Sequence, residues 1–320
     1  MSNLSHKFLS MLVFLAASAT TNAFAAPADS QLLRMVPAGA EIVSGIADPG
    51  TRGATGRILA DIDSNNRDFN DCLALIGIDH DKAIDEVIEA ASSTEAGDLS
   101  DRLLLLSGRF HLGTIFKSAL EIGATRNEHD GVSLLVIPPF QREQQPTEQV
   151  RWLAILDDRI LVFGTPGMVA NALDRHVHDE RADPILVQRL AQLRSDANSW
   201  SVLAMRPPML AAHLALYPLS KSWQGALRDV DELAVGIHYG HYDRVEFVLH
   251  SKDGNHIGQL LTRGQLVPAS LTSVRSLHVE RLSADENCIR GSFTVRVTEL
   301  DSWLKSVESA RSLRAAESNK

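Results

Sequence analysis

Apolar residues follow two different spacings along this chain, and the two spacings alternate. Short apolar or alternating runs, typical of strands, occur at residues 41–47, 103–110 and 159–163. Between them, apolar residues recur every three or four positions at residues 111–122 and again from Pro166 onward, which is typical of helices. The pattern predicts a mixed protein in which helices pack on a sheet.

The same order of elements occurs a second time in the C-terminal half. Residues 84–90, Ile-Asp-Glu-Val-Ile-Glu-Ala, resemble residues 230–236, Val-Asp-Glu-Leu-Ala-Val-Gly. Each stretch is followed by a polar break and a second apolar run, which in the C-terminal half is residues 245–249. A fixed order of elements that occurs twice indicates duplication of one unit. The other C-terminal elements are expected at residues 200–205, 255–266 and 292–297.

The repeat resolves an ambiguity at residues 84–91, whose apolar positions also fit one face of a helix. In the aligned copy Leu233, Val235 and Ile237 alternate, which is strand spacing. Since two copies of one unit share a fold, we predict a strand at 84–91 that pairs antiparallel with 103–110.

These elements predict an α+β fold of two similar units, each an antiparallel sheet with helices packed on one face. Each unit is expected to run strand, helix, two strands, helix, two or three strands, helix. The expected boundaries are a first unit at residues 31–178, a linking helix within 179–198, a second unit at 199–312 and a polar tail at 313–320.

The N-terminus has the layout of a secretory signal peptide. Lys7 precedes an apolar run over residues 8–19, and Ala23-Phe24-Ala25 supplies the small residues that precede a cleavage site. The apolar run is shorter than the roughly 20 residues that span a bilayer. We therefore expect residues 1–25 to be removed, Ala26 to begin the mature chain, and the product to be periplasmic or secreted.

Composition limits the partners of such a protein. The chain carries 31 Lys and Arg against 40 Asp and Glu, and its formal net charge of −9 repels phosphate backbones and anionic lipids. Aromatic residues make up 5% of the chain, which argues against a surface that stacks sugars or bases. We expect no nucleic-acid partner and no membrane insertion after signal cleavage. Cys72 and Cys288 either form a disulfide, which export permits, or are two separate thiols.

The densest cluster of chemically active residues is His238-Tyr-Gly-His241-Tyr-Asp243, with His250 and His256 nearby. Histidine with aspartate is a zinc ligand set. A three-residue hairpin loop at 240–242 would pair Ile237 with Val245 and keep the apolar residues on one face, whereas a two-residue loop would not. In that register His238 lies opposite Arg244, Asp243 points to the other face and His250 lies beside Glu232. We therefore predict exposed strand and turn histidines, and no metal site.

Four further motifs are better explained by structure than by chemistry. The stretch 61–66 begins like a calcium loop but has Cys72 where the bidentate Glu belongs. Ser302 and Lys305 match S-x-x-K without its companion motifs. His176 and His178 suit a helix C-terminus, and Asp157-Asp158 suits a hairpin turn. The sequence thus nominates no catalytic, cofactor-binding or metal-binding residue, and no cofactor.

Two stretches, Leu33–Glu41 and Leu153–Gly164, resemble uncharacterised exported bacterial proteins built from two α+β repeats. The resemblance implies no activity, because none is known for that group. We therefore expect an exported, non-catalytic module that binds a protein or small-molecule partner, or forms part of a periplasmic or surface assembly. The alternative is a secreted hydrolase whose site is assembled at the junction of the two halves.

Overall fold

The computed structural model describes residues 30–47, 73–78, 84–92, 101–139, 150–193, 197–204, 230–251, 276–285, 287–299 and 302. Several features expected from the sequence lie outside these residues: the signal peptide 1–25, the calcium-like stretch 61–66, Cys72, the helix at 255–266, and the tail 313–320. Among the described residues, none of the helices has the length and apolar character needed to span a bilayer.

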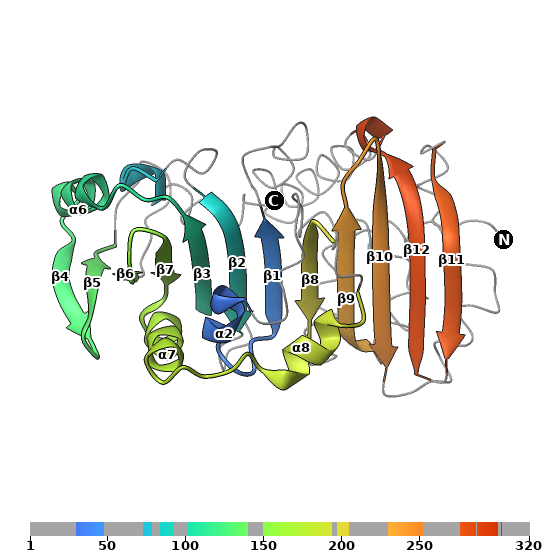
Figure 1. Cartoon of the computed structure of the whole chain (residues 1–320), viewed down its shortest axis with the longest axis horizontal. Coiled ribbons are helices and arrows are strands. Elements are labelled where there is room, and N and C mark those ends of the chain that lie inside the picture. The colour runs from blue at the N-terminus through green and yellow to red at the C-terminus, as the bar shows by residue number, and fades with distance from the viewer. Residues whose placement is uncertain are drawn as a thin grey trace, which may run out of the picture.

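The described strands form one twelve-stranded sheet in which every neighbouring pair is antiparallel (Figure 1). Its spatial order is β11-β12-β10-β9-β8-β1-β2-β3-β7-β6-β5-β4. The strands are β1 (Ile42–Ala47), β2 (Ile84–Ser92), β3 (Asp101–Gly108), β4 (Thr125–His129), β5 (Val132–Ile137), β6 (Arg151–Ile155), β7 (Ile160–Gly164), β8 (Ser199–Leu203), β9 (Val230–His238), β10 (Tyr242–Ser251), β11 (His278–Asp285) and β12 (Cys288–Arg296).

The two halves of the chain meet at the pair β1–β8, so the sheets expected for the two halves are parts of one continuous sheet. Ser44 lies opposite Ser201 in this pair, and Gly45 lies opposite Trp200. The indole of Trp200 covers Gly45 so closely that a Cβ there would lie 2.2 Å from Cε2 of the ring. The glycine is required because the ring occupies the space that a side chain at position 45 would need.

The predicted pairings are confirmed. Residues 84–92 form a strand that pairs antiparallel with β3, although their apolar positions also fit a helix. In the second hairpin Ile237 lies opposite Val245, as the apolar alternation requires. Of the predicted helices, those at 111–122, from Pro166 onward and within 179–198 are present, as α6 (Leu112–Glu121), α7 (Pro166–Val177) and α8 (Pro184–Leu190).

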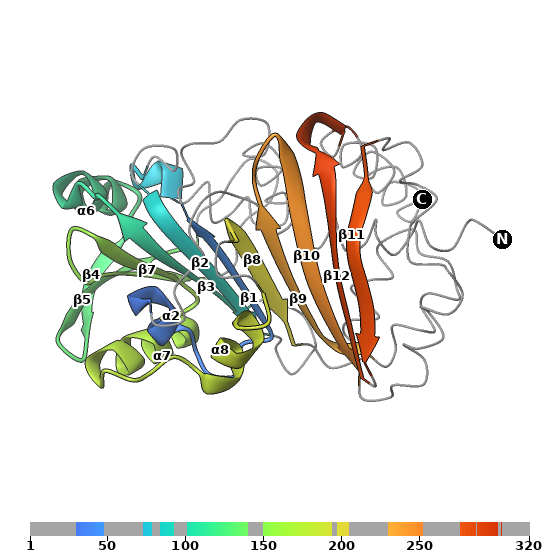
Figure 2. The ribbon, with the colours of Figure 1, turned by 45° about the vertical axis from the view of Figure 1, so that its right-hand side comes forward.

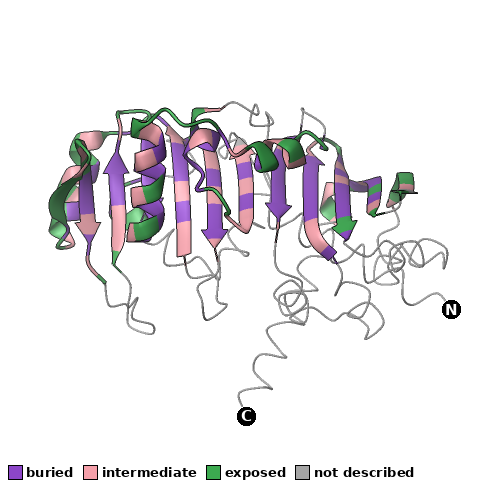
Figure 3. Ribbon diagram, turned by 90° about the horizontal axis from the view of Figure 1, so that it is seen from below, coloured by how far each residue is buried: buried purple, intermediate pink, exposed green. Residues whose placement is uncertain are grey.

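The expectation that helices cover one face only is wrong for the first half. The helices α7, α8 and α2 (Gln31–Met35) pack on one face, as Figure 2 shows, and α6 packs on the other. Neighbouring residues of β7 demonstrate this, because Val162 belongs to the core with α7 and Phe163 to the core with α6. All five residues of β7 are buried. Buried residues, purple in Figure 3, occur on most strands across the sheet.

The sequence also predicted too few strands after α6. Four strands lie between α6 and α7, and the additional hairpin β4–β5 forms one end of the sheet. Its turn consists of Asp130 and Gly131, with φ of 48° and 82°. Positive φ at both central residues defines the two-residue turn that suits the right-handed twist of a hairpin.

Candidate functional site

A pocket of about 430 Å³ lies where the two halves of the chain meet. The chain after α2 forms one wall, α8 forms another, and β1 and β8 contribute the base. Its lining residues are Val36, Pro37, Ala38, Gly39, Ala40, Val43, Asp183, Ile185, Leu186, Arg189, Val202 and Ala204. The volume falls within the range of roughly 300–1,000 Å³ that is usual for sites that bind small molecules.

Local sequence explains the two walls of this junction pocket. Asp183 precedes Pro184 and caps α8, since its Oδ1 accepts a hydrogen bond of 2.8 Å from the Ile185 amide. The wall formed by residues 36–40 turns at Pro37, whose carbonyl accepts from the Ala40 amide. Gly39 permits that turn because its φ is +80°.

The chemistry of the junction pocket is that of binding rather than of acid–base catalysis. Its two charged lining residues are both engaged: Asp183 caps α8, and the Arg189 guanidinium donates from Nε to Glu232 at 2.8 Å. Ile185, which lines the pocket, is 54% exposed and presents apolar surface to solvent. The lining can therefore hold an apolar group. Among the described lining residues, no two carboxylates and no histidine with a carboxylate lie together.

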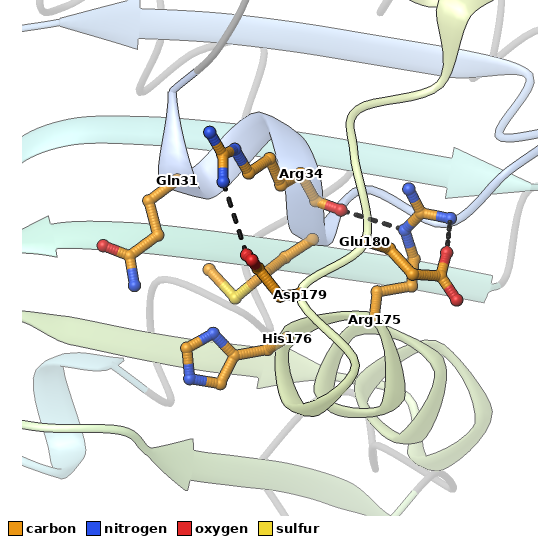
Figure 4. Close-up of a pocket in the computed structure, with 7 residues that line it drawn as sticks. Gln31, Arg34, Arg175, His176, Asp179 and Glu180 are labelled. Atoms are coloured by element: carbon orange, nitrogen blue, oxygen red, sulfur yellow. Dashed lines mark hydrogen bonds and ion pairs between the residues drawn. The ribbon is translucent and has the colours of Figure 1, made fainter.

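A second cavity of about 300 Å³ lies between α2 and the C-terminal end of α7 (Figure 4). Arg175 is 8% exposed and uses its whole guanidinium: Nε donates to the Arg34 carbonyl, Nη2 to the Arg181 carbonyl and Nη1 to Glu180. These bonds fasten α2 to the end of α7, so Arg175 has a structural role. The lining residues are Gln31, Arg34, Met35, Arg175, His176, Asp179 and Glu180.

The charges of this second cavity balance one another. Arg34 lies 3.4 Å from Asp179, and Arg175 lies 2.6 Å from Glu180. His176 lines the cavity, whereas His178 bonds through Nδ1 to the Asp174 carbonyl at 2.7 Å. The two histidines therefore do not form one site, as their spacing predicted.

The histidine-rich hairpin has the geometry expected from its register. His238 lies opposite Arg244, and His250 lies opposite Glu232 and bonds Asp231 at 3.3 Å. Asp243 is buried on the other face, where its Oδ1 accepts from the Gly240 amide. The prediction of exposure is correct for His241 and wrong for His238, whose side chain is only 14% exposed. His256 lies outside the described residues.

Two of the remaining motifs have structural roles. Asp157 closes the turn between β6 and β7 by accepting from the amides of Arg159 and Ile160, as predicted. The hydroxyl of Ser302 donates to the Thr298 carbonyl, and Lys305 lies outside the described residues.

Cys288 carries a free, half-buried thiol. Burial raises the pKa of this thiol, which keeps it protonated.

Comparisons of the chain with protein families, with curated proteins and with solved structures found no match. The functional argument therefore rests on the geometry of the sites. The sequence analysis placed a site at the junction of the halves only under the hydrolase alternative. It nominated none of the pocket's residues, because the walls come from residues 36–43, 183–189 and 202–204.

Proposed function

We propose that the mature chain is an exported, non-catalytic binding module whose ligand occupies the junction pocket. The observation that carries this proposal is the combination of an apolar lining, an exposed Ile185 and two charged residues that already have partners. Such a pocket gains affinity by removing apolar surface from water. Its ligand is an apolar group, either of a small molecule or of a partner protein.

Export is part of the same proposal. The N-terminal sequence supports cleavage after Ala25 and a periplasmic or secreted product. Loss of the signal removes Lys7, so the mature chain is one charge more negative than the precursor. That charge favours a neutral or basic ligand and disfavours nucleic acid.

We further propose that the two halves are copies of one α+β unit joined by residues 179–198. The strand order outward from the centre supports this: β1, β2, β3, β7 and β6 in one direction, and β8, β9, β10, β12 and β11 in the other. The aligned residues Glu89 and Val235 occupy equivalent positions, because Glu89 lies opposite Ser44 and Val235 lies opposite Ser201. The linking segment contains α8, which forms one wall of the junction pocket. The pocket therefore lies where the two proposed copies meet.

The binding proposal is tested with an uncharged apolar fluorescent dye, Nile red, whose emission rises when it leaves water. Ile185→Glu places a charge at the rim of the junction pocket, and Val177→Glu places one at a similarly exposed apolar residue on α7. We expect the mature protein to bind the dye, Ile185→Glu to weaken binding at least about tenfold, and Val177→Glu to leave it unchanged.

Equal binding by both variants and the parent protein would refute the junction pocket as the binding site. The hydrolase alternative has its own signature, which is turnover of generic chromogenic esters or peptides that Asp183→Asn abolishes without unfolding the chain. That result would replace the binding proposal with an enzymatic one.

A further inference from the structure

The tip of the hairpin β4–β5 meets the last turn of α7. His129 Nε2 lies 2.8 Å from Asp174 Oδ1, although 45 residues separate the two. A carboxylate oxygen of Asp130 completes the group, and the three ligand atoms all lie within 4.8 Å of one another. An imidazole nitrogen and two carboxylate oxygens thus converge on one point.

The fold constrains each member of this group. Asp130 occupies the first central position of the hairpin turn at φ 48°, which Asp tolerates better than most residues. The ring of His129 lies against Trp152 of β6 at a centroid distance of 6.2 Å, and its side chain is 26% exposed. Asp174 is anchored in α7. Two rigid elements therefore hold the ligand atoms together, and the group is still open to water on one side.

The electrostatics favour a cation at this point. The C-terminal turn of a helix carries a negative partial charge, so a carboxylate there is unfavourable unless a cation offsets it. Asp174 lies in that region of α7, and its neighbour across the gap is a second carboxylate, Asp130. The imidazole of His129 is the one described side chain that contacts Asp174 through an ion pair. The negative charge of the two carboxylates and of the helix end is therefore offset, within this group, only when the His129 ring is protonated or a cation binds.

We propose that His129, Asp130 and Asp174 form a site for a divalent first-row transition-metal ion such as Zn²⁺. Imidazole and carboxylate are ligands of such ions, and three protein ligands leave one position for water. In a tetrahedral site with bonds of about 2.0–2.2 Å, neighbouring ligand atoms lie about 3.3–3.6 Å apart. His129 and Asp174, now 2.8 Å apart, need to separate by about 0.5–0.8 Å, and a pair at the 4.8 Å limit needs to approach by about 1.2–1.5 Å. The site is distinct from the junction pocket, and it replaces the expectation of no metal ligand.

The test is a titration of the chelator-treated mature protein with Zn²⁺ against a competing chromophoric indicator. We expect one strong site per chain, and a loss of affinity of at least about tenfold in both His129→Ala and Asp174→Asn. Asp130→Asn keeps a residue that accepts positive φ and is expected to weaken Zn²⁺ binding as well. His241→Ala is the control, because His241 is an exposed histidine outside this group.

Circular dichroism of each variant verifies that the fold is kept. The absence of a stoichiometric strong site would overturn the proposal, and would leave His129 and Asp174 as an ion pair that fastens the hairpin to α7. Zn²⁺ affinity that survives in Asp174→Asn, or that falls equally in His241→Ala, would likewise overturn it.

Discussion

The hydroxyl oxygens of Ser44 and Ser201 lie 2.8 Å apart across the pair β1–β8, where the two halves of the chain become one sheet. The Ala204 amide donates to the Glu41 carbonyl in the same pair. Since hydrogen-bonded and non-hydrogen-bonded positions alternate, Ser44 and Ser201 occupy a non-hydrogen-bonded position, where side chains lie closest. This junction determines the pocket, because β1 and β8 form its base.

The junction should be sensitive to added bulk at Gly45. A Cβ at this position meets the Trp200 ring at 2.2 Å, and Trp200 is only 3% exposed, so the ring has little room to move. We expect Gly45→Ala to lower the free energy of unfolding by about 1–3 kcal/mol, because the added methyl group overpacks this position. Gly113→Ala on α6 is the control, since its Cβ has nothing within 4 Å and should stabilise the helix by about 0.5–1 kcal/mol. Urea unfolding measures both, and an unchanged midpoint for Gly45→Ala would contradict the packing of β1 against β8.

Glu86 of β2 should make stability depend on pH in an identifiable direction. Burial raises the pKa of its carboxyl above 4.5, and its Oε1 has no hydrogen-bond partner among the described residues. The folded state then binds the proton more tightly than the unfolded state. The free energy of unfolding therefore falls as the pH rises and this carboxyl ionises.

The stabilisation produced by Glu86→Gln should therefore be larger at about pH 7 than at about pH 4. Urea unfolding at the two pH values measures it. Glu121→Gln, at an exposed carboxylate of α6, should show no such difference. If Glu86→Gln raised the free energy of unfolding more at about pH 4 than at about pH 7, the prediction would be contradicted.

The sequence predicted those parts of the fold in which apolar and polar residues segregate clearly. The pairing of Ile237 with Val245 follows from alternation and loop length alone. The edge strand β4, Thr-Arg-Asn-Glu-His, was missed because it is mostly exposed and has no apolar pattern. The apolar run of β7 could have predicted cover on both faces, since strands buried on both faces are apolar throughout.

The sites were less accessible to sequence analysis for a physical reason. Neither the junction pocket nor the His129–Asp174 group contains a local motif, and both consist of residues that only the sheet topology brings together. The densest local motif, the hairpin with His238 and His241, has its histidines and Asp243 separated by the pleat of the strands. Residues that are close in sequence along these strands therefore do not bring their ligand atoms close together.

Replacing the two hairpin histidines should have no metal-dependent effect. His241 is exposed, so His241→Ala should change the free energy of unfolding by no more than about 0.5 kcal/mol. His238 lies 3.8 Å from Glu246 and is largely covered, so His238→Ala should cost more, on the order of 1 kcal/mol. Thermal unfolding with and without a chelator measures the double variant against the parent protein. A difference in melting temperature that appears only without chelator would indicate a metal bound at this hairpin.

The most direct test of the continuous sheet is a disulfide across its centre. In a background of Cys72→Ser and Cys288→Ser, we expect Ser44→Cys with Ser201→Cys to form an intramolecular disulfide on mild oxidation, because directly opposed antiparallel residues have suitable Cα separations. The off-register pair Ser44→Cys with Ser199→Cys should not, since position 199 lies opposite Ile46. Mass spectrometry of the oxidised proteins measures both. Efficient cross-linking of 44 with 201 alone is the predicted result, and equal cross-linking of both pairs, or of neither, would contradict the junction of the two halves at β1 and β8.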